Sequence, residues 1–288
     1  MHRLCSRLPR PHQRLASLAG TAVLALGLGL AALLPVLSPA TATAFPQDAF
    51  VSAAPAGSLI QPGDLIHTDA IRKSGVACHV KNGSNNTART EAWRLPASGL
   101  AYQVNTASFP LYLNSSQTLT AITNAATAWT AAGAPALTYA GTTATNGTIG
   151  DGANTIGFAD LSGLNLGPVA SVATMLIRSG VVVEADVVLD ATNLWSTNPQ
   201  ASGECGGDPL RYDVQNAMTH EFGHWIGAAH TPLIDVSGYN HRTMYPVIDP
   251  GELQKRSPTP GDIASIPSQS VAPSSFSGTV SRSGDDDG

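Results

Sequence analysis

The chain has 288 residues, enough for one good-sized domain with flanking segments, and only 12% of them are charged, about half of the usual share. Serine, threonine, asparagine, glycine and alanine are abundant, so we expect a surface that is polar without being charged, as in many secreted proteins. The formal net charge of −5 at pH 7 argues against nucleic acid as a partner, because binding of nucleic acid requires a basic face.

Residues 1–44 differ in composition from the rest of the chain. Four arginines without any acidic residue precede an apolar stretch from Leu15 to Leu34, and small residues follow up to Ala44. This order predicts a secretory signal peptide that is cleaved after Ala44 or Ala42. An uncleaved membrane anchor is the alternative, since about 20 apolar residues can span a bilayer. Cleavage would remove four arginines and no acid, which moves the formal charge from −5 to −9.

Two further segments flank the expected domain. Residues 45–92 contain few periodic apolar patterns and much alanine, proline, glycine, serine and asparagine, so we expect an extended N-terminal segment, either a propeptide or a strap across the domain. Residues 268–288 are rich in serine and end in an acidic run. They offer almost nothing to bury, and we expect a disordered tail. The folded domain is therefore predicted to span residues 93–267.

Short strands are expected at several places in this domain. Two β-branched runs at 169–177 and 181–189 surround Arg178-Ser179-Gly180, which predicts a hairpin. Further short strands are predicted at 101–106, 137–140 and 155–159.

Two helices are expected among these strands. Apolar residues recur at helical spacing over 116–132, with Ser115 or Ser116 as the N-cap. A second helix is expected to be capped by Asp208 and to end at Gly227 in a left-handed conformation. Its apolar stripe lies opposite the two histidines that it carries, and consists of Val214, Met218, Phe222 and Trp225. The order of strands and helices predicts an α+β domain with one sheet backed by helices.

Three histidines lie on and just after the second helix. His220 and His224 are four positions apart, so both imidazoles face the same side and can hold one ion at about 2.0–2.1 Å. Gly227 allows the chain to turn sharply, which brings His230 to the same ion. Three protein ligands leave a fourth position for water, as in catalytic zinc sites. The sequence therefore predicts one catalytic zinc ion on these three histidines.

Glu221 lies between the two helical ligands and beside the predicted water position. It can accept the proton of the attacking water and pass it to the departing amine of a peptide. Zinc would lower the pKa of the water and polarise the carbonyl oxygen. We therefore predict hydrolysis of peptide bonds with Glu221 as the general base.

The sequence His-Glu-x-x-His-x-x-Gly-x-x-His at 220–230, followed by Thr243-Met244-Tyr245-Pro246, resembles the metzincins and, within them, the matrixin-like zinc metallopeptidases, bacterial relatives of the matrix metalloproteinases. The resemblance covers roughly residues 93–267. It implies a twisted, mostly parallel five-stranded sheet with three helices and a zinc cleft. It also implies that Met244 forms an apolar floor under the zinc.

The resemblance further implies how the protein acts. We expect a secreted, extracellular metalloendopeptidase that acts as a monomer on protein or peptide substrates, with no stable membrane association after signal cleavage. The substrate would add as a strand to an edge of the sheet, for which residues 169–174 are the candidate. An ordinary buried strand is the alternative for this run.

The family that the sequence resembles also has other metal sites, a structural zinc and calcium. A second, structural zinc is not expected, because no histidine occurs between His79 and His220. Calcium is common in the family, and the acidic candidates are Asp151, Glu184, Asp186 and Asp190. The alternative is that these are solvated carboxylates of turns and strands.

The two cysteines that remain after signal cleavage, Cys78 and Cys205, allow two interpretations. An even number of cysteines in an oxidising compartment favours a disulfide between them. Alternatively, Cys78 fills the open zinc position as a thiolate and keeps the protein latent. The matrixin activation motif is missing around this cysteine, which favours the disulfide.

Two rival functions remain open. One is a catalytically silent zinc-containing adhesion or binding protein, and the presence of Glu221 argues against it. The other is a zinc amidase acting on cell-wall peptides, and such enzymes rarely combine the third histidine with a methionine turn.

Overall fold

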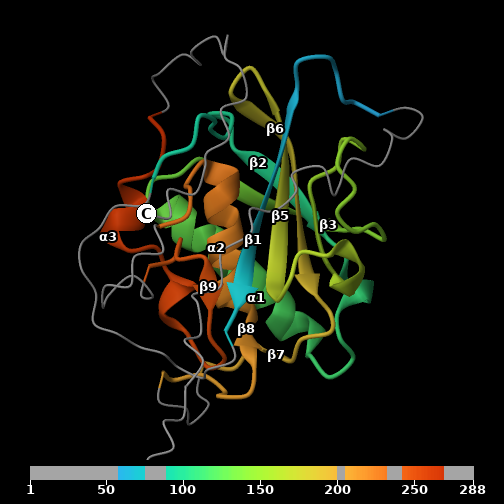
Figure 1. The fold of residues 1–288 in the computed structure, drawn as a ribbon, viewed down its shortest axis with the longest axis vertical. Coiled ribbons are helices and arrows are strands. Elements are labelled where there is room, and N and C mark those ends of the chain that lie inside the picture. Colours follow the sequence, from blue (N-terminus) through green and yellow to red (C-terminus); the bar gives the residue numbers. More distant parts are fainter. Residues whose placement is uncertain (1–57, 75–88, 200–204, 232–241, 269–288) are drawn as a thin grey trace, which may run out of the picture. The chain divides into compact units, whose positions relative to one another are not determined.

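The computed structural model describes residues 58–74, 89–199, 205–231 and 242–268, which form a seven-stranded mixed sheet and three α-helices (Figure 1). The predicted signal peptide lies outside the described residues, as does the predicted tail after residue 268. The strand order is β3 (Leu137–Thr142), β2 (Leu100–Val104), β4 (Thr155–Ala159), β6 (Val181–Asp190), β5 (Val169–Arg178), β1 (Leu65–Lys73) and β9 (Val247–Ile248).

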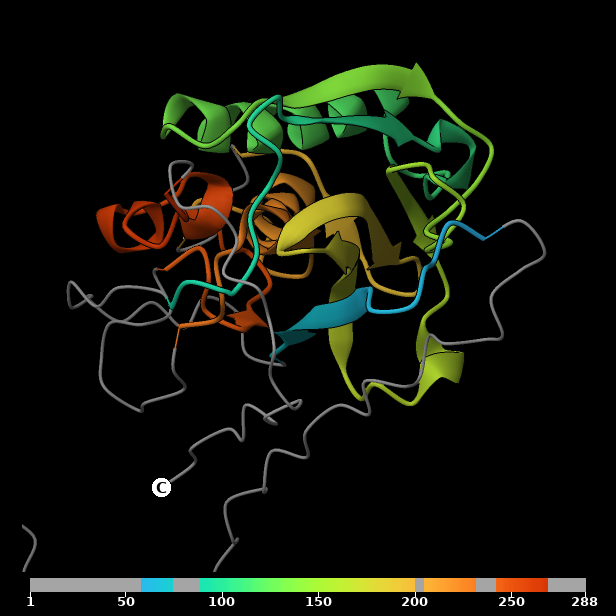
Figure 2. The same ribbon diagram turned by 90° about the horizontal axis from the view of Figure 1, so that it is seen from above.

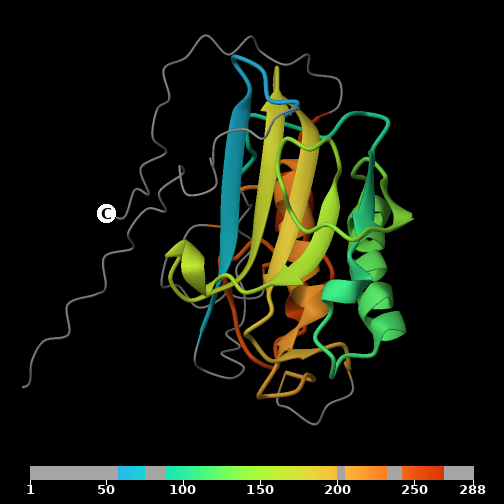
Figure 3. The same cartoon turned by 90° about the vertical axis from the view of Figure 1, so that its right-hand side faces the viewer.

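The predicted α+β class, the mostly parallel sheet and the three helices are confirmed. Strands β3, β2, β4 and β6 are parallel neighbours, whereas β5 is antiparallel to both β6 and β1. The expectation of five strands is wrong. Residues 65–73 extend the sheet beyond β5, and β9 then pairs in parallel with β1, which adds two strands to the other five. Figure 3 shows β1 running alongside β5.

The hairpin predicted around residues 178–180 is confirmed. Ser179 and Gly180 have φ values of 51° and 72°, and two successive left-handed residues form the turn whose twist suits a hairpin. Strand β5 is buried along almost its whole length. It was expected to offer a free edge to substrate, but β6 and β1 pair with both of its edges.

Helix α1 (Ser115–Ala131) forms where the apolar spacing predicts it. Its buried face includes Ile122, Ala126 and Trp129. The predicted serine caps are wrong, because the side chain of Asn114 accepts a hydrogen bond from the Gln117 N–H and thus caps the helix one residue earlier. Both α1 and α2 (Val214–Ile226) lie on the same face of the sheet (Figure 2).

The cap of helix α2 lies five residues later than predicted. Asp208 instead holds a turn, in which its side chain accepts the Leu210 N–H at 3.0 Å. The chain then forms β8 (Tyr212–Asp213), paired with β7 (Trp195–Ser196), and Asp213 caps the helix. The predicted apolar stripe of α2 is confirmed, because its four members are fully buried: Val214, Met218, Phe222 and Trp225.

Short helices complete the fold. Among the described residues they are the 3₁₀ turns η1 (Thr106–Ser108), η2 (Ser162–Leu164) and η4 (Gln254–Arg256), and the one-turn helix α3 (Pro260–Ile263). Within the described ranges, no helix is both long and apolar enough to cross a membrane.

Candidate metal centre

Helix α2 carries two of the three predicted metal ligands. The Asp213 carboxylate accepts the Asn216 N–H at 2.8 Å and is bonded to the Arg256 guanidinium at 2.8 and 2.6 Å, which anchors the start of the helix. His220 and His224 follow one turn apart, and both are fully buried. Their common orientation is what the helical spacing predicts.

The third ligand reaches the site because the chain reverses at Gly227. This glycine has a φ of 103°, in the region where a side chain is strained. A Cβ at this position would lie 2.4 Å from the carbonyl oxygen of Trp93. The Ala228 N–H bonds back to the carbonyl of Gly223 at 2.9 Å, and His230 follows two residues later. The predicted role of Gly227 is confirmed.

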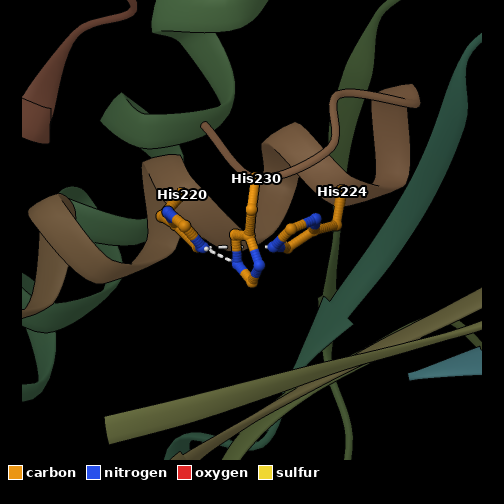
Figure 4. Close-up of side chains that lie close together, drawn as sticks. All are labelled: His220, His224 and His230. Carbon is orange, nitrogen blue, oxygen red and sulfur yellow. Dashed lines mark hydrogen bonds between the residues drawn. The ribbon is translucent and has the colours of Figure 1, made fainter. Parts of the chain in front are cut away.

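The three imidazoles converge on one point (Figure 4). The Nε2 atoms of His220 and His230 are 3.1 Å apart, and those of His224 and His220 are also 3.1 Å apart. A tetrahedral ion with bonds of about 2.0–2.1 Å separates its ligand atoms by roughly 3.3–3.4 Å, so this spacing fits a single ion. The structure thus brings together all three predicted ligands, and the trio can hold a metal ion.

The second nitrogens of two imidazoles have fixed acceptors. Nδ1 of His220 donates to the Thr243 carbonyl at 2.6 Å, and Nδ1 of His224 donates to the Ala228 carbonyl at 3.1 Å. Because a carbonyl only accepts, each Nδ1 carries the proton and each Nε2 presents its lone pair. Burial lowers the pKa of His224 to about 3 and also lowers the pKa of His220. Both rings are therefore neutral at pH 7, as metal binding requires.

Met244 is fully buried against α2. A Cβ on Gly223 would lie 2.2 Å from the Met244 Sδ, so only glycine leaves room for the sulfur. The N–H groups of Thr243 and Met244 donate to the Asp262 carboxylate at 3.1 and 3.3 Å. The Met244 carbonyl accepts the Thr231 N–H at 2.8 Å. These bonds hold the methionine against the turn of α2 that carries the histidines.

Glu221 is fully buried beside the histidines. Its Oε1 accepts a hydrogen bond from the Ser171 hydroxyl at 2.6 Å. Its Oε2 has no hydrogen-bond partner within the described part of the chain. Burial raises the pKa of Glu221 to about 8, although the Ser171 hydrogen bond opposes this rise. Such a carboxylate is suited to take up and release a proton.

Strand β1 lies against the same site and contributes Asp69. Its Oδ2 lies 3.3 Å from Nδ1 of His224, and its Oδ1 lies 3.8 Å from Nδ1 of His230. Burial disfavours the charged form of Asp69, but the neighbouring histidines outweigh burial and hold the pKa of Asp69 well below its usual range. The sequence reasoning missed this residue, because residues 45–92 show no clear periodicity. The alternation of His67 and Asp69 along one strand face is the only signal that could have pointed to it.

A second group of ligand-type side chains adjoins the trio. His67, Asp69 and Glu91 have ligand atoms within 4.8 Å of one another, and all three side chains are partly exposed. The His67 Nε2 and the Asp69 Oδ2 are 2.9 Å apart. Burial raises the pKa of Glu91 to about 7. Asp69, a residue of the N-terminal segment, therefore lies next to both groups: it belongs to this second group and is also close to His224 and His230.

The acidic residues considered for calcium are bonded to protein groups. Glu184 accepts three consecutive backbone N–H groups at 2.6 to 3.2 Å, and Asp186 accepts the N–H and the hydroxyl of Thr155, both at 2.8 Å. Asp151 and Asp190 bond within their own turns. Neither of the two groups of described residues that could share a metal includes them. A turn-anchoring role accounts for their contacts, and calcium binding stays a prediction.

Cys205 is disulfide-bonded in the structure. Cys78, the partner predicted from the sequence, lies outside the described residues.

Comparison with protein-family models finds no match for this chain. A comparison with curated proteins likewise finds no similar sequence.

Proposed function

We propose that the chain is a secreted zinc-dependent metalloendopeptidase that hydrolyses peptide bonds of extracellular proteins. The observation that carries this proposal is the convergence of three Nε2 atoms on one point with the buried Glu221 on the same helix turn. Imidazole nitrogens suit zinc among the common metals. Three protein ligands leave a coordination position for water or substrate, which distinguishes catalytic zinc sites from structural ones.

Different residues of the chain would carry out different steps of the hydrolysis. Bound zinc would supply Lewis-acid polarisation of the scissile carbonyl and activation of water. Glu221 would accept the proton of the attacking water and deliver it to the departing nitrogen. The Ser171 hydroxyl orients this carboxylate through its 2.6 Å hydrogen bond.

The two motifs at 220–230 and 243–246 support membership of the matrixin-like metzincins as part of the same proposal. The protein would act outside the cell as a monomer after loss of residues 1–44. A silent zinc-containing binding protein would have no need for a carboxylate with an unpartnered oxygen next to the metal. A zinc amidase would share the metal chemistry and differ in its substrate.

The proposal is tested on the secreted protein by metal analysis together with digestion assays. We expect about one zinc per chain, and a chelator should abolish hydrolysis of casein. Glu221→Ala should retain the zinc and lose activity by roughly 10²–10⁴-fold, the usual contribution of a general base. Activity that survives in Glu221→Ala would overturn the mechanism, and cleavage of cell-wall fragments without casein would favour the amidase.

A further inference from the structure

The second group of ligand-type side chains, His67, Asp69 and Glu91, has the geometry of a metal site of its own. His67 and Asp69 are two positions apart on β1, so their side chains leave the strand on the same side. Glu91 completes the group, and one ligand atom of each residue lies within 4.8 Å of those of the other two. The His67 Nε2 and the Asp69 Oδ2 are 2.9 Å apart. Two zinc bonds of about 2.1 Å that meet at a right angle span roughly 3.0 Å, so one cation can bind both atoms.

The charges of the group also favour a cation. Asp69 and Glu91 place two carboxylates in the same partly buried surroundings. The ion pairs of Asp69 are with histidines only. Within the described ranges, the Glu91 carboxylate has no hydrogen bond and no ion pair. Two like charges so close together repel each other. A divalent cation offsets both charges, whereas a single protonated imidazole offsets only one.

This group is distinct from the histidine trio. Asp69 approaches the Nδ1 atoms of His224 and His230, at 3.3 and 3.8 Å. The trio converges through its Nε2 atoms instead. Asp69 therefore contacts these two rings at other nitrogens than those that would bind the ion of the trio. Its carboxylate is available to a second ion.

Glu91 belongs to a segment that is bonded to the turn at the end of α2. Its N–H donates to the Gly227 carbonyl at 2.7 Å, and the Ala229 N–H donates to the Arg89 carbonyl at 2.8 Å. These bonds hold the segment against the turn that leads to the third ligand of the trio. A cation shared by Glu91 and β1 would therefore fasten the N-terminal strand to this turn.

We propose that His67, Asp69 and Glu91 form a second metal site, which takes zinc or a similar divalent transition metal and fastens β1 to the segment around Glu91. One imidazole and two carboxylates are donors that suit zinc. The three side chains are partly exposed, so an ion can reach them from solvent. They hold it less tightly than the trio does, because two of the imidazoles of the trio are fully buried. The second site therefore fills only when free zinc is supplied.

The test counts zinc ions on the full chain that follows the signal peptide. Every chain carries Glu221→Ala, so that no hydrolysis can remove residues 45–92, and the trio is loaded with zinc beforehand. Isothermal titration calorimetry with zinc chloride then measures further binding. Glu91→Gln keeps the shape of the side chain and removes its charge. The matched control is Asp160→Asn, which makes the same change of charge at an exposed position.

We expect about one further zinc ion per chain, bound with a dissociation constant in the micromolar range, and lower deuterium uptake over residues 65–73 once it is bound. Glu91→Gln should weaken this binding by more than roughly tenfold, because even changes next to a metal ligand cost about 10–100-fold in affinity. Asp160→Asn should leave it unchanged. If circular dichroism shows that Glu91→Gln is unfolded, His67→Ala takes its place, with the same expected loss.

The absence of a second binding event in the folded chain overturns the inference, as does equal weakening by Glu91→Gln and Asp160→Asn. Displacement of the second zinc by an equal concentration of magnesium also overturns it, because imidazole suits zinc and not magnesium. The peptidase function is assayed in parallel on the chain that retains Glu221. A second zinc without hydrolysis of casein supports the second site and counts against the peptidase, whereas hydrolysis with a single zinc does the reverse.

Discussion

The two sides of the metal centre differ in how the chain builds them. The helix side comes from residues 220–230 and 242–244 and is held by side-chain hydrogen bonds, a left-handed glycine and the buried Met244. The strand side, β1, comes from about 150 residues earlier in the chain and is held mainly by backbone pairing with β5 and β9. The helix side therefore depends on the identity of each side chain, whereas the strand side depends mainly on main-chain hydrogen bonds.

The difference suggests a division of roles. The helix side is preorganised to hold a cation, because its ring nitrogens have assigned acceptors and its interior is closely packed. On the strand side, specific side-chain contacts come from Asp69 and Ile71. Substitutions on the helix side should therefore change metal binding and stability, and substitutions on the strand side should change how firmly β1 is held in the sheet.

The largest effect is expected from removing a metal ligand. His224→Ala should reduce the zinc content from about one per chain to near zero and abolish hydrolysis, because two nitrogens cannot make up for a lost ligand of a three-histidine site. Inductively coupled plasma mass spectrometry measures the zinc. His67→Ala is the matched control, since this histidine contacts Asp69 but lies outside the trio. Equal loss of zinc in both variants would contradict the assignment of ligands.

The next largest effect is expected at Asp262. This fully buried carboxylate accepts the N–H groups of Thr243, Met244 and Thr259. Asp262→Ala leaves these donors without a partner, and we expect a loss of about 3 kcal/mol in the free energy of unfolding. Urea denaturation measures it. Asp160→Ala, at an exposed position, should change stability by less than about 0.5 kcal/mol, and equal losses in the two variants would refute the anchoring role.

Gly223→Ala tests the packing between α2 and the methionine. Alanine normally stabilises a helix interior by up to about 1 kcal/mol over glycine. Here a Cβ would lie 2.2 Å from the Met244 Sδ, so we expect a loss of about 1–3 kcal/mol from overpacking. The double variant Gly223→Ala/Met244→Ala should be less destabilised than the sum of the two single changes. Strict additivity in urea denaturation would show that the two residues do not collide.

The smallest effect is expected at the start of β1. Arg178 donates two hydrogen bonds to Asp64, at 2.9 and 2.8 Å, and holds the pKa of Asp64 below its usual range. Asp64→Asn should raise deuterium uptake over residues 65–73 and cost less than about 1 kcal/mol. Because the folded pKa is depressed, the contribution is present above about pH 4 and is lost as the pH falls through the lowered pKa. Unchanged uptake at pH 7 would mean that the pair does not hold β1.

Sequence reasoning succeeded where the structure depends on neighbours within one turn or one hairpin. The i, i+4 spacing of His220 and His224 settles which side of α2 they share, and Gly227 is the residue that permits the reversal to His230. The hairpin of β5 and β6 follows from two β-branched runs around a short turn. These features need no information about distant parts of the chain.

The same reasoning failed where more than one residue near the start of a helix could cap it equally well. Asp208 and Asp213 can both cap a helix, and the pairing of β8 with β7 leaves only Asp213 at the start of α2. Asn114 and the serines after it are likewise all good caps. At α2, the strand pairing just before the helix therefore decides which aspartate caps it.

By itself, the sequence determined the helix side of the site, because a metal motif and a helical repeat are patterns of short range. Only the tertiary structure decided the strand side. Nothing in the alternation of residues 65–73 indicates that they pair with β5, because the two strands are about a hundred residues apart in the chain and their register is set only when both are in place. Asp69 belongs to the site for that reason, and a sequence pattern that describes one segment at a time cannot contain this information.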